Sequence, residues 1–170
     1  MDDQKRQSKI KSSDIIIDFF KVAVLKKGPK DLPKSNLLLA IVILTALFIS
    51  SINHGLPVAM TETFTVIFIT YLLLALRNYP NRYTQTVTAL FGGGIVISLV
   101  VSMLFFFTDQ LPTLIRFIIF FWNLSLITNI IRLSLSANIF FASVISLIYV
   151  ISVLVMVSVI GPETFPNELK

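Results

Sequence analysis

Five apolar runs constrain this chain more than any other feature of its sequence. They cover about residues 36–52, 58–76, 86–108, 113–132 and 139–160. About 20 apolar residues in a helix are enough to cross the roughly 30 Å hydrocarbon layer of a bilayer. Because lipid offers no hydrogen bonds, the backbone must satisfy its own polar groups, as a helix does. We therefore predict an all-α, polytopic membrane helix bundle with about five transmembrane helices.

Charged residues are few and lie mostly before the first apolar run. Only 14% of the residues are charged and 55% are hydrophobic, whereas an average soluble domain is about 25% charged and 45–50% apolar. Nine of the fourteen Lys and Arg residues precede position 36. This distribution predicts three segments: a polar arm at 1–35, the bundle at 36–160 and a short polar tail at 161–170.

The polar arm contains a predicted amphipathic helix at Asp14–Lys27, followed by Gly28 and Pro29. At 100° per residue, its charged side chains share one face and its apolar side chains occupy much of the other. It is too short to span a bilayer. Gly28 suits the position just past a helix end. We expect a helix that either lies in the membrane interface or packs on the cytoplasmic ends of the spans.

Three lysines of this arm are candidates for contact with lipid headgroups. Lys21 lies on the polar face of the predicted helix, and Lys26 and Lys27 lie at its end. A basic helix at a membrane surface is attracted to anionic lipids. These positions motivate one possible role, which is lipid handling at the cytoplasmic face.

The distribution of basic residues also predicts the orientation. Cytoplasmic loops carry an excess of Lys and Arg. With the N-terminus inside, the inner segments hold nine, two and one basic residues, while the outer segments hold only Lys170, with Arg116 inside a span near that side. We predict a multi-pass protein of the bacterial inner membrane, with its N-terminus in the cytoplasm and its C-terminus in the periplasm.

Small residues recur in the third run. Gly92, Gly93 and Gly94 are consecutive, and Ser98 and Ser102 follow at intervals of four. A face with small residues at this spacing lets two membrane helices approach closely. Close helix packing is therefore one interpretation of these residues. The alternative is a flexible gate or an unwound binding segment.

The fourth run, Leu111–Leu135, carries an unusual number of polar side chains for a span. Helical spacing places Trp122, Asn129 and Arg132 on one face, and Arg116 and Asn123 on another. Polar groups inside a bilayer normally face protein or a water-filled cavity. This run is therefore a candidate polar site within the membrane.

Several roles are open to these polar side chains. Arg116 has the reach to snorkel to the outer surface, to pair with Asp109 or Glu62, or to contact an anionic substrate or lipid. Asn123 and Asn129 are suited to join helices through hydrogen bonds or to bind a ligand.

Residue types needed for many kinds of catalysis are missing. The chain has no Cys and one His, His54, which excludes disulfides, thiol catalysis and zinc sites built from Cys and His. His54 is expected to be a loop residue. No phosphate-binding or nucleic-acid-binding motif is recognisable. We predict no enzyme activity, no cofactor, no metal and no nucleic-acid partner.

Two stretches carry a resemblance to a known family. They are FFKVAVLKKGPKDLPKS at 19–35 and FFWNLSLITNIIRLSLSAN at 120–138. In the order of these parts, the chain resembles small bacterial proteins of the Yip family of multispan membrane proteins. The resemblance implies five helical spans and a non-enzymatic role, and it carries no functional residues over to this chain.

Three functions fit these observations. The first is an accessory or scaffold subunit that acts through helix–helix or lipid contacts, with other membrane proteins or a second copy of the chain as partners. The alternative is a small transporter or channel subunit with a polar path near Arg116, Asn123 and Gly92–Gly94. The second alternative is lipid handling. All three require the lipid bilayer itself as a partner.

Overall fold

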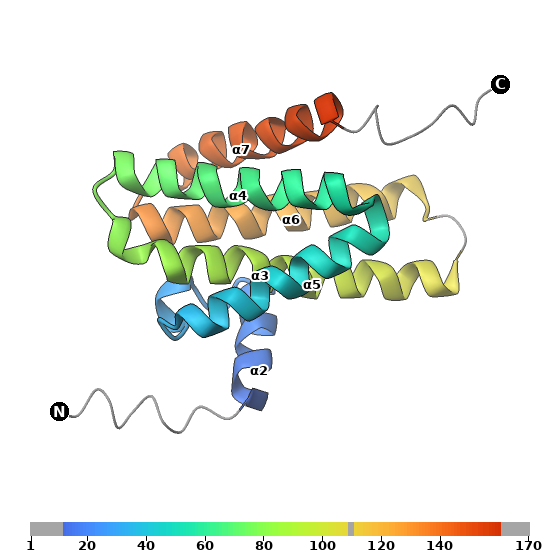
Figure 1. The fold of residues 1–170 in the computed structure, drawn as a ribbon, viewed down its shortest axis with the longest axis horizontal. Helices are drawn as coiled ribbons and strands as arrows, with labels where there is room; N and C mark the ends of the chain where they lie inside the picture. The colour runs from blue at the N-terminus through green and yellow to red at the C-terminus, as the bar shows by residue number, and fades with distance from the viewer. Residues whose placement is uncertain (1–11, 109–110, 161–170) are drawn as a thin grey trace.

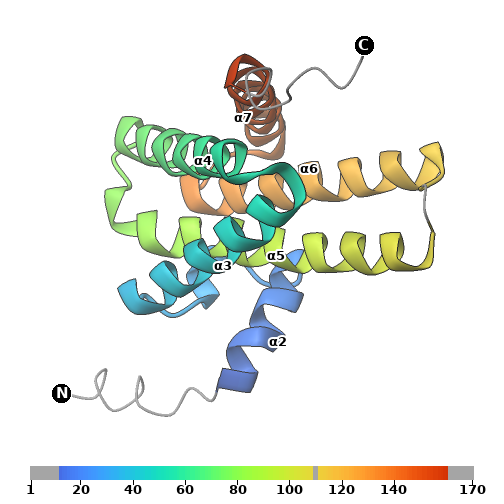
Figure 2. The same ribbon diagram turned by 45° about the vertical axis from the view of Figure 1, so that its right-hand side comes forward.

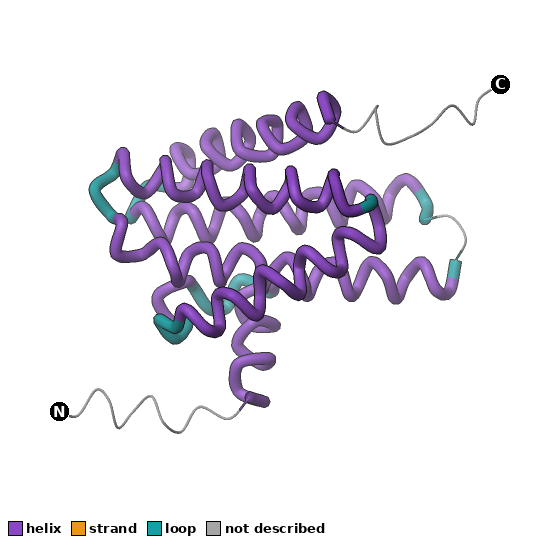
Figure 3. The backbone as a smooth tube through the Cα atoms, in the orientation of Figure 1, coloured by secondary structure: helices purple, strands orange, loops and turns teal. Residues whose placement is uncertain are grey.

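A computed structural model describes residues 12–108 and 111–160, so Asp109 and the predicted tail at 161–170 lie outside the described residues. The five long helices are α3 (Asn36–His54), α4 (Leu56–Leu76), α5 (Tyr83–Phe107), α6 (Thr113–Leu135) and α7 (Ile139–Ile160). All five are long and apolar enough to cross a membrane. The described part of the chain is helical, with short connections between its helices (Figure 3). The predicted all-α membrane bundle is confirmed.

The long helices form a closed ring. Helix α3 packs against α4 and α5, α7 packs against α4 and α6, and α5 packs against α6. Figure 1 shows the axes of α4, α5 and α6 nearly parallel to one another, with α3 and α7 inclined to them and consecutive spans running in opposite senses. Helix α4 also contacts α5 across the ring. Side chains from all five spans point into the ring.

The two ends of the ring differ in charge and in shape. We call the end that holds Arg77, Arg82 and Arg132 the basic end, and the opposite end, with the turn between α3 and α4, the distal end. Gly55 forms that turn with φ +84°, a conformation that glycine adopts without a steric penalty. At the distal end, the α5–α6 hairpin extends beyond the α3–α4 turn (Figure 1).

Helix α2 (Ser12–Ala23) lies across the direction of the spans (Figure 2). It ends four residues before Lys27, because Leu25 adopts the left-handed conformation with φ +62° and the Lys26 amide donates to the Lys21 carbonyl oxygen at 2.8 Å. The expectation that Gly28 closes this helix is therefore wrong. Gly28 is extended and precedes a short 3-10 helix, η1 (Pro29–Asp31). A Cβ at Gly28 would lie 2.5 Å from Leu133 Cδ1, so this glycine permits a close contact with α6.

Helix α2 packs on the flank of the ring rather than on the ends of the spans. Val22 and Ala23 are fully buried, and the Trp122 Nε1 donates to the Ala23 carbonyl oxygen at 2.8 Å. The Phe19 ring lies against Gly92, where an added Cβ would come within 2.4 Å of it. Gly92 is nine residues from Tyr83, which is about 14 Å along α5 at 1.5 Å per residue.

Polar contacts join α5 to the end of α6 at the basic end. The Arg82 Nη1 donates to the Ser134 carbonyl oxygen at 2.6 Å and to the Ser136 Oγ at 2.9 Å. The Ser134 and Thr86 hydroxyls are hydrogen-bonded to each other at 2.9 Å in a buried position, with Thr86 accepting because its own proton goes to the Arg82 carbonyl oxygen. The last carbonyls of a helix lack partners within the helix and carry partial negative charge. Arg82 therefore caps α6 from a neighbouring span.

Candidate functional site

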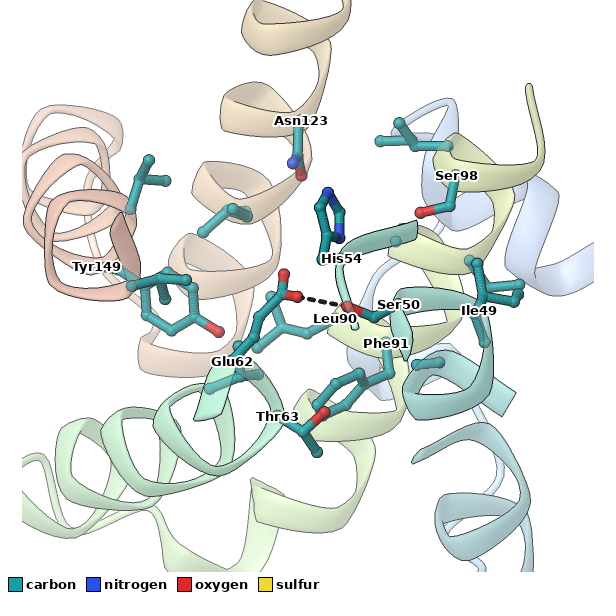
Figure 4. Close-up of a pocket in the computed structure, with 18 of the residues that line it drawn as sticks. Ile49, Ser50, His54, Glu62, Thr63, Leu90, Phe91, Ser98, Asn123 and Tyr149 are labelled. Atoms are coloured by element: carbon teal, nitrogen blue, oxygen red, sulfur yellow. Dashed lines mark hydrogen bonds between the residues drawn. The ribbon is translucent and has the colours of Figure 1, made fainter. Parts of the chain in front are cut away.

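A cavity of about 380 Å³ lies inside the ring and is lined by side chains from all five spans. Its volume is in the range of small-molecule binding sites, which are mostly apolar with a few placed polar groups. The polar residues along its wall are Ser50, Asn53, His54, Glu62, Thr63, Ser98, Asn123 and Tyr149. Figure 4 shows how these side chains, apart from Asn53, lie around the space.

Glu62 is the acidic group of this cavity. It is half-buried and lies six residues from the start of α4, about 9 Å along the helix. The Ser50 hydroxyl of α3 donates to the Glu62 Oε2 at 2.8 Å (Figure 4). Among the described residues, the one ion pair joins Lys27 and Asp18. Glu62 therefore has no cationic partner in the described part of the chain.

The cavity reaches the distal end of the ring. Asn53 and His54 lie beside the α3–α4 turn, and both line the cavity. Both are exposed, and so is Asn123 of α6. These three side chains form a polar entrance above Glu62. The cavity wall therefore extends from Glu62 to the α3–α4 turn at the distal end.

Tyr149 of α7 forms the floor of the cavity. It is 4% exposed, and together with Leu90 it also lines a second, much smaller gap on the side toward the basic end. Thr70 lies along that gap and is 3% exposed. The Tyr149 hydroxyl lies near Thr70, but no described atom meets hydrogen-bond geometry with the Thr70 Oγ1. A layer one side chain thick thus separates the two spaces.

Among the described residues, the Thr70 hydroxyl is the one buried side-chain group outside hydrogen-bond geometry, although the Tyr149 hydroxyl lies near it. The Thr65, Thr86 and Thr88 hydroxyls each donate to the carbonyl oxygen four residues earlier. A buried hydroxyl without a partner costs about 1–3 kcal/mol. Buried orphan groups in native proteins call for an explanation such as a strained state, a functional role or an ordered ion or water.

The small residues of α5 fall into three different environments. Gly92 faces Phe19 of α2, and Gly93 faces Leu126 of α6, where an added Cβ would lie 2.9 Å from Leu126 Cδ2. Gly94 lines the cavity, and an added Cβ there meets nothing within 4 Å. Ser98 also lines the cavity, and Ser102 is exposed. Of the three consecutive glycines, Gly92 and Gly93 thus permit close contacts with neighbouring helices, and Gly94 borders the cavity.

The polar residues of α6 are also divided. Asn123 lines the cavity, and Trp122 points to α2. The Arg132 Nη2 donates to the Asn129 Oδ1 at 3.1 Å along the same helix. Arg116 is exposed and does not line the cavity. Among the described residues, Arg116 has no ion-pair partner. Glu62, one of the partners considered for it, lines the cavity instead.

The three candidate lysines of the arm, Lys21, Lys26 and Lys27, lie on or near α2. Lys21 and Lys26 are exposed. The Lys27 Nζ forms an ion pair with the Asp18 Oδ1 at 2.6 Å, and both side chains are partly buried. This pair ties the segment that follows α2 back onto the helix, which leaves Lys21 and Lys26 as the freely accessible charges.

Several polar residues of the cavity wall were not among the sequence candidates for a site, including Ser50 and Tyr149. Glu62 was considered there only as a possible partner of Arg116. One signal was available for Glu62, since it is the one Asp or Glu within the first three apolar runs. No comparable signal marks Tyr149, because a tyrosine in an apolar run is equally typical of lipid contact.

Comparison of the chain with protein-family models, curated proteins and solved structures found no match. The resemblance in layout to the Yip family stays a prediction. Within residues 12–108 and 111–160, no three His, Asp or Glu side chains lie close enough together to hold a metal ion.

Proposed function

We propose that this protein is a small membrane transporter whose substrate binds in the cavity inside the five-helix ring. The observation that carries the proposal is the position of Glu62, which lies in that cavity without a cationic partner among the described residues. An ionisable side chain in a membrane span is expensive and is by default a sign of function. In the predicted orientation, the distal end faces the periplasm.

The arrangement of the two spaces supports translocation rather than binding alone. The larger cavity reaches the distal end at Asn53 and His54, and the smaller gap extends toward the basic end on the other side of Tyr149 and Leu90. Transporters commonly hold their substrate near the middle of the bilayer and alternate access to it. A modest shift of α7 against α4 would move Tyr149 and connect the gap with the cavity.

The cysteine-free sequence allows a direct test of this proposal by single-cysteine labelling. We expect Ser98→Cys, which lies on the cavity wall, to react with a membrane-impermeant methanethiosulfonate added at the distal face. We expect Thr70→Cys, below Tyr149, to react more slowly and with reagent added at the basic face. We expect both reactions because, in a transporter, water and the reagent reach the cavity from the distal face and the gap from the basic face in turn.

The matched control is Leu99→Cys, because Leu99 is the neighbour of Ser98 in α5, is 53% exposed and does not line the cavity. It should stay unreactive toward both faces in the membrane and react only after denaturation. If Ser98→Cys and Leu99→Cys react equally, or if Thr70→Cys is never modified in the native protein, the transport proposal is wrong.

An accessory or scaffold role is the second candidate, and the exposure of α3 favours it. The only buried hydrophobic residue of α3 is Val42, and five large apolar side chains form an exposed stripe: Leu37, Ile41, Leu44, Phe48 and Ile52. This stripe has the spacing of one helix face, so a helix of another protein can pack there in place of lipid. A complex larger than the 19.1 kDa chain on a native gel, together with unreactive cavity cysteines, would favour this role.

A further inference from the structure

We infer that the cavity selects a small organic cation with an apolar body, which binds to Glu62 and to the aromatic side chains around it. This inference rests on the proposed function, since it names the substrate class of the same cavity. It goes beyond that proposal because a cavity of this size in a membrane protein can equally serve anions or neutral molecules.

The charges that face the cavity come from two helices. Among the lining residues, Glu62 of α4 is the only acid, and His54 of α3 is the only side chain that can become positive. No Lys or Arg of the described segments lines the space. The polar groups contributed by α5, α6 and α7 are Ser98, Asn123 and Tyr149, which are uncharged at neutral pH. With His54 neutral, the cavity carries one negative charge, and low-dielectric walls strengthen its field.

The hydrogen bonding of Glu62 leaves room for a ligand. The Ser50 hydroxyl donates to Oε2, and Oε1 has no hydrogen bond or ion pair with the described residues. A carboxylate oxygen can accept more than one hydrogen bond. A bound cation would compensate both the charge and the free oxygen, which the protein itself does not do.

The remaining wall suits an organic cation better than a metal ion. Phe91, Phe120 and Tyr149 line the cavity together with several aliphatic side chains. Aromatic faces attract cations, and quaternary ammonium groups are typical ligands of such sites. By contrast, Ca²⁺ takes six to eight oxygen ligands, whereas this wall offers one carboxylate. An apolar substituent of the cation would also be buried favourably against this aromatic and aliphatic surface.

The inference can be tested by protection of a cavity cysteine in the purified full-length protein. Ser98→Cys would be labelled with the neutral reagent methyl methanethiosulfonate in the presence of benzyltrimethylammonium, a cation, or phenylmethanesulfonate, an anion of similar shape. We expect the cation to slow labelling by at least about tenfold and the anion to leave it unchanged, because only the cation pairs with Glu62.

Glu62 variants in the Ser98→Cys background identify the charge that is responsible. Glu62→Gln should raise the concentration of benzyltrimethylammonium that gives half protection by roughly tenfold or more, and Glu62→Asp should retain protection because it keeps the carboxylate. Size-exclusion chromatography of both variants checks that they fold.

The possible outcomes distinguish a failure of the cation inference from a failure of the proposed transport function. Protection by both compounds, or protection that survives Glu62→Gln, would overturn the cation inference and leave an accessible cavity in place. Labelling of Ser98→Cys that neither compound slows would overturn it as well. Failure of Ser98→Cys to react in the native protein, with full reaction after denaturation, would reject the cavity and therefore the proposed function too.

Discussion

Replacing Arg82 with alanine is expected to lower the free energy of unfolding by about 3 kcal/mol, because two charge-assisted hydrogen bonds are lost. The Arg82 guanidinium donates to the Ser134 carbonyl oxygen and to the Ser136 hydroxyl, and it also lies over the Tyr79 ring at 4.3 Å. Its loss leaves the last carbonyls of α6 without a cap and weakens the α5–α6 contact at the basic end. Thermal unfolding in detergent should show a midpoint lower by roughly 6–12 °C.

Arg77→Ala is the matched control for this experiment. Arg77 is exposed and lies over the Phe141 ring at 4.3 Å, a contact worth about 0.5–1 kcal/mol at an exposed site. Arg82→Lys should fall between the two, because lysine keeps the positive charge but its ammonium group lacks the planar donor geometry and the ring stacking of the guanidinium. Equal losses of unfolding free energy in Arg77→Ala and Arg82→Ala would show that the cap on α6 does not contribute to stability.

Replacing Gly92 with leucine is expected to release α2 from the ring. An added Cβ would already lie 2.4 Å from the Phe19 ring, so the larger side chain forces Phe19 and its helix away. The backbone around Lys21, Lys26 and Lys27 is then no longer held on the ring and can enter the trypsin active site. Cleavage in this segment should accelerate by at least about tenfold, which corresponds to about 1.4 kcal/mol.

Gly94→Leu is the matched control, because it makes the same substitution two residues along α5. Its Cβ meets nothing within 4 Å, and the side chain enters the cavity. Trypsin cleavage of the arm should therefore keep its rate, while the labelling of Ser98→Cys should slow because the cavity is filled. Equal acceleration of trypsin cleavage in both variants would mean that α2 is not held at Gly92.

The five spans could be predicted from the sequence because each apolar run is long, and bilayer thickness sets a strict length requirement. The order of the helices in the ring could not be predicted in the same way. Spans such as 139–160 are apolar on nearly every face, so their helical periodicity does not show which side turns inward. The end of α2 was also missed, because Leu25 takes the left-handed conformation that favours glycine and leaves Gly28 free for the contact with Leu133.

The candidate site could be predicted only in part. Asn123, Gly94 and Ser98 stood out as polar or small residues within apolar runs, and all three line the cavity. Arg116 stood out for the same reason, yet it faces outward. Glu62 and Ser50 lie twelve residues apart across the α3–α4 turn, and Tyr149 joins them from α7. Sequence spacing within one helix cannot bring residues from three helices together, so the carboxylate at the centre of the site became apparent only in the folded ring.

The central claim is that a water-accessible cavity containing Glu62 lies inside a ring of five membrane spans. The most direct test is the deuterium modulation of a spin label at Ser98→Cys or Leu99→Cys, measured by pulsed electron paramagnetic resonance on protein in bilayers prepared with D₂O. The two positions are adjacent in α5, but only Ser98 lines the cavity. Strong modulation at Ser98 and weak modulation at Leu99 is the predicted result. Equally weak modulation at both positions would show that the interior of the ring is dry and would contradict the account.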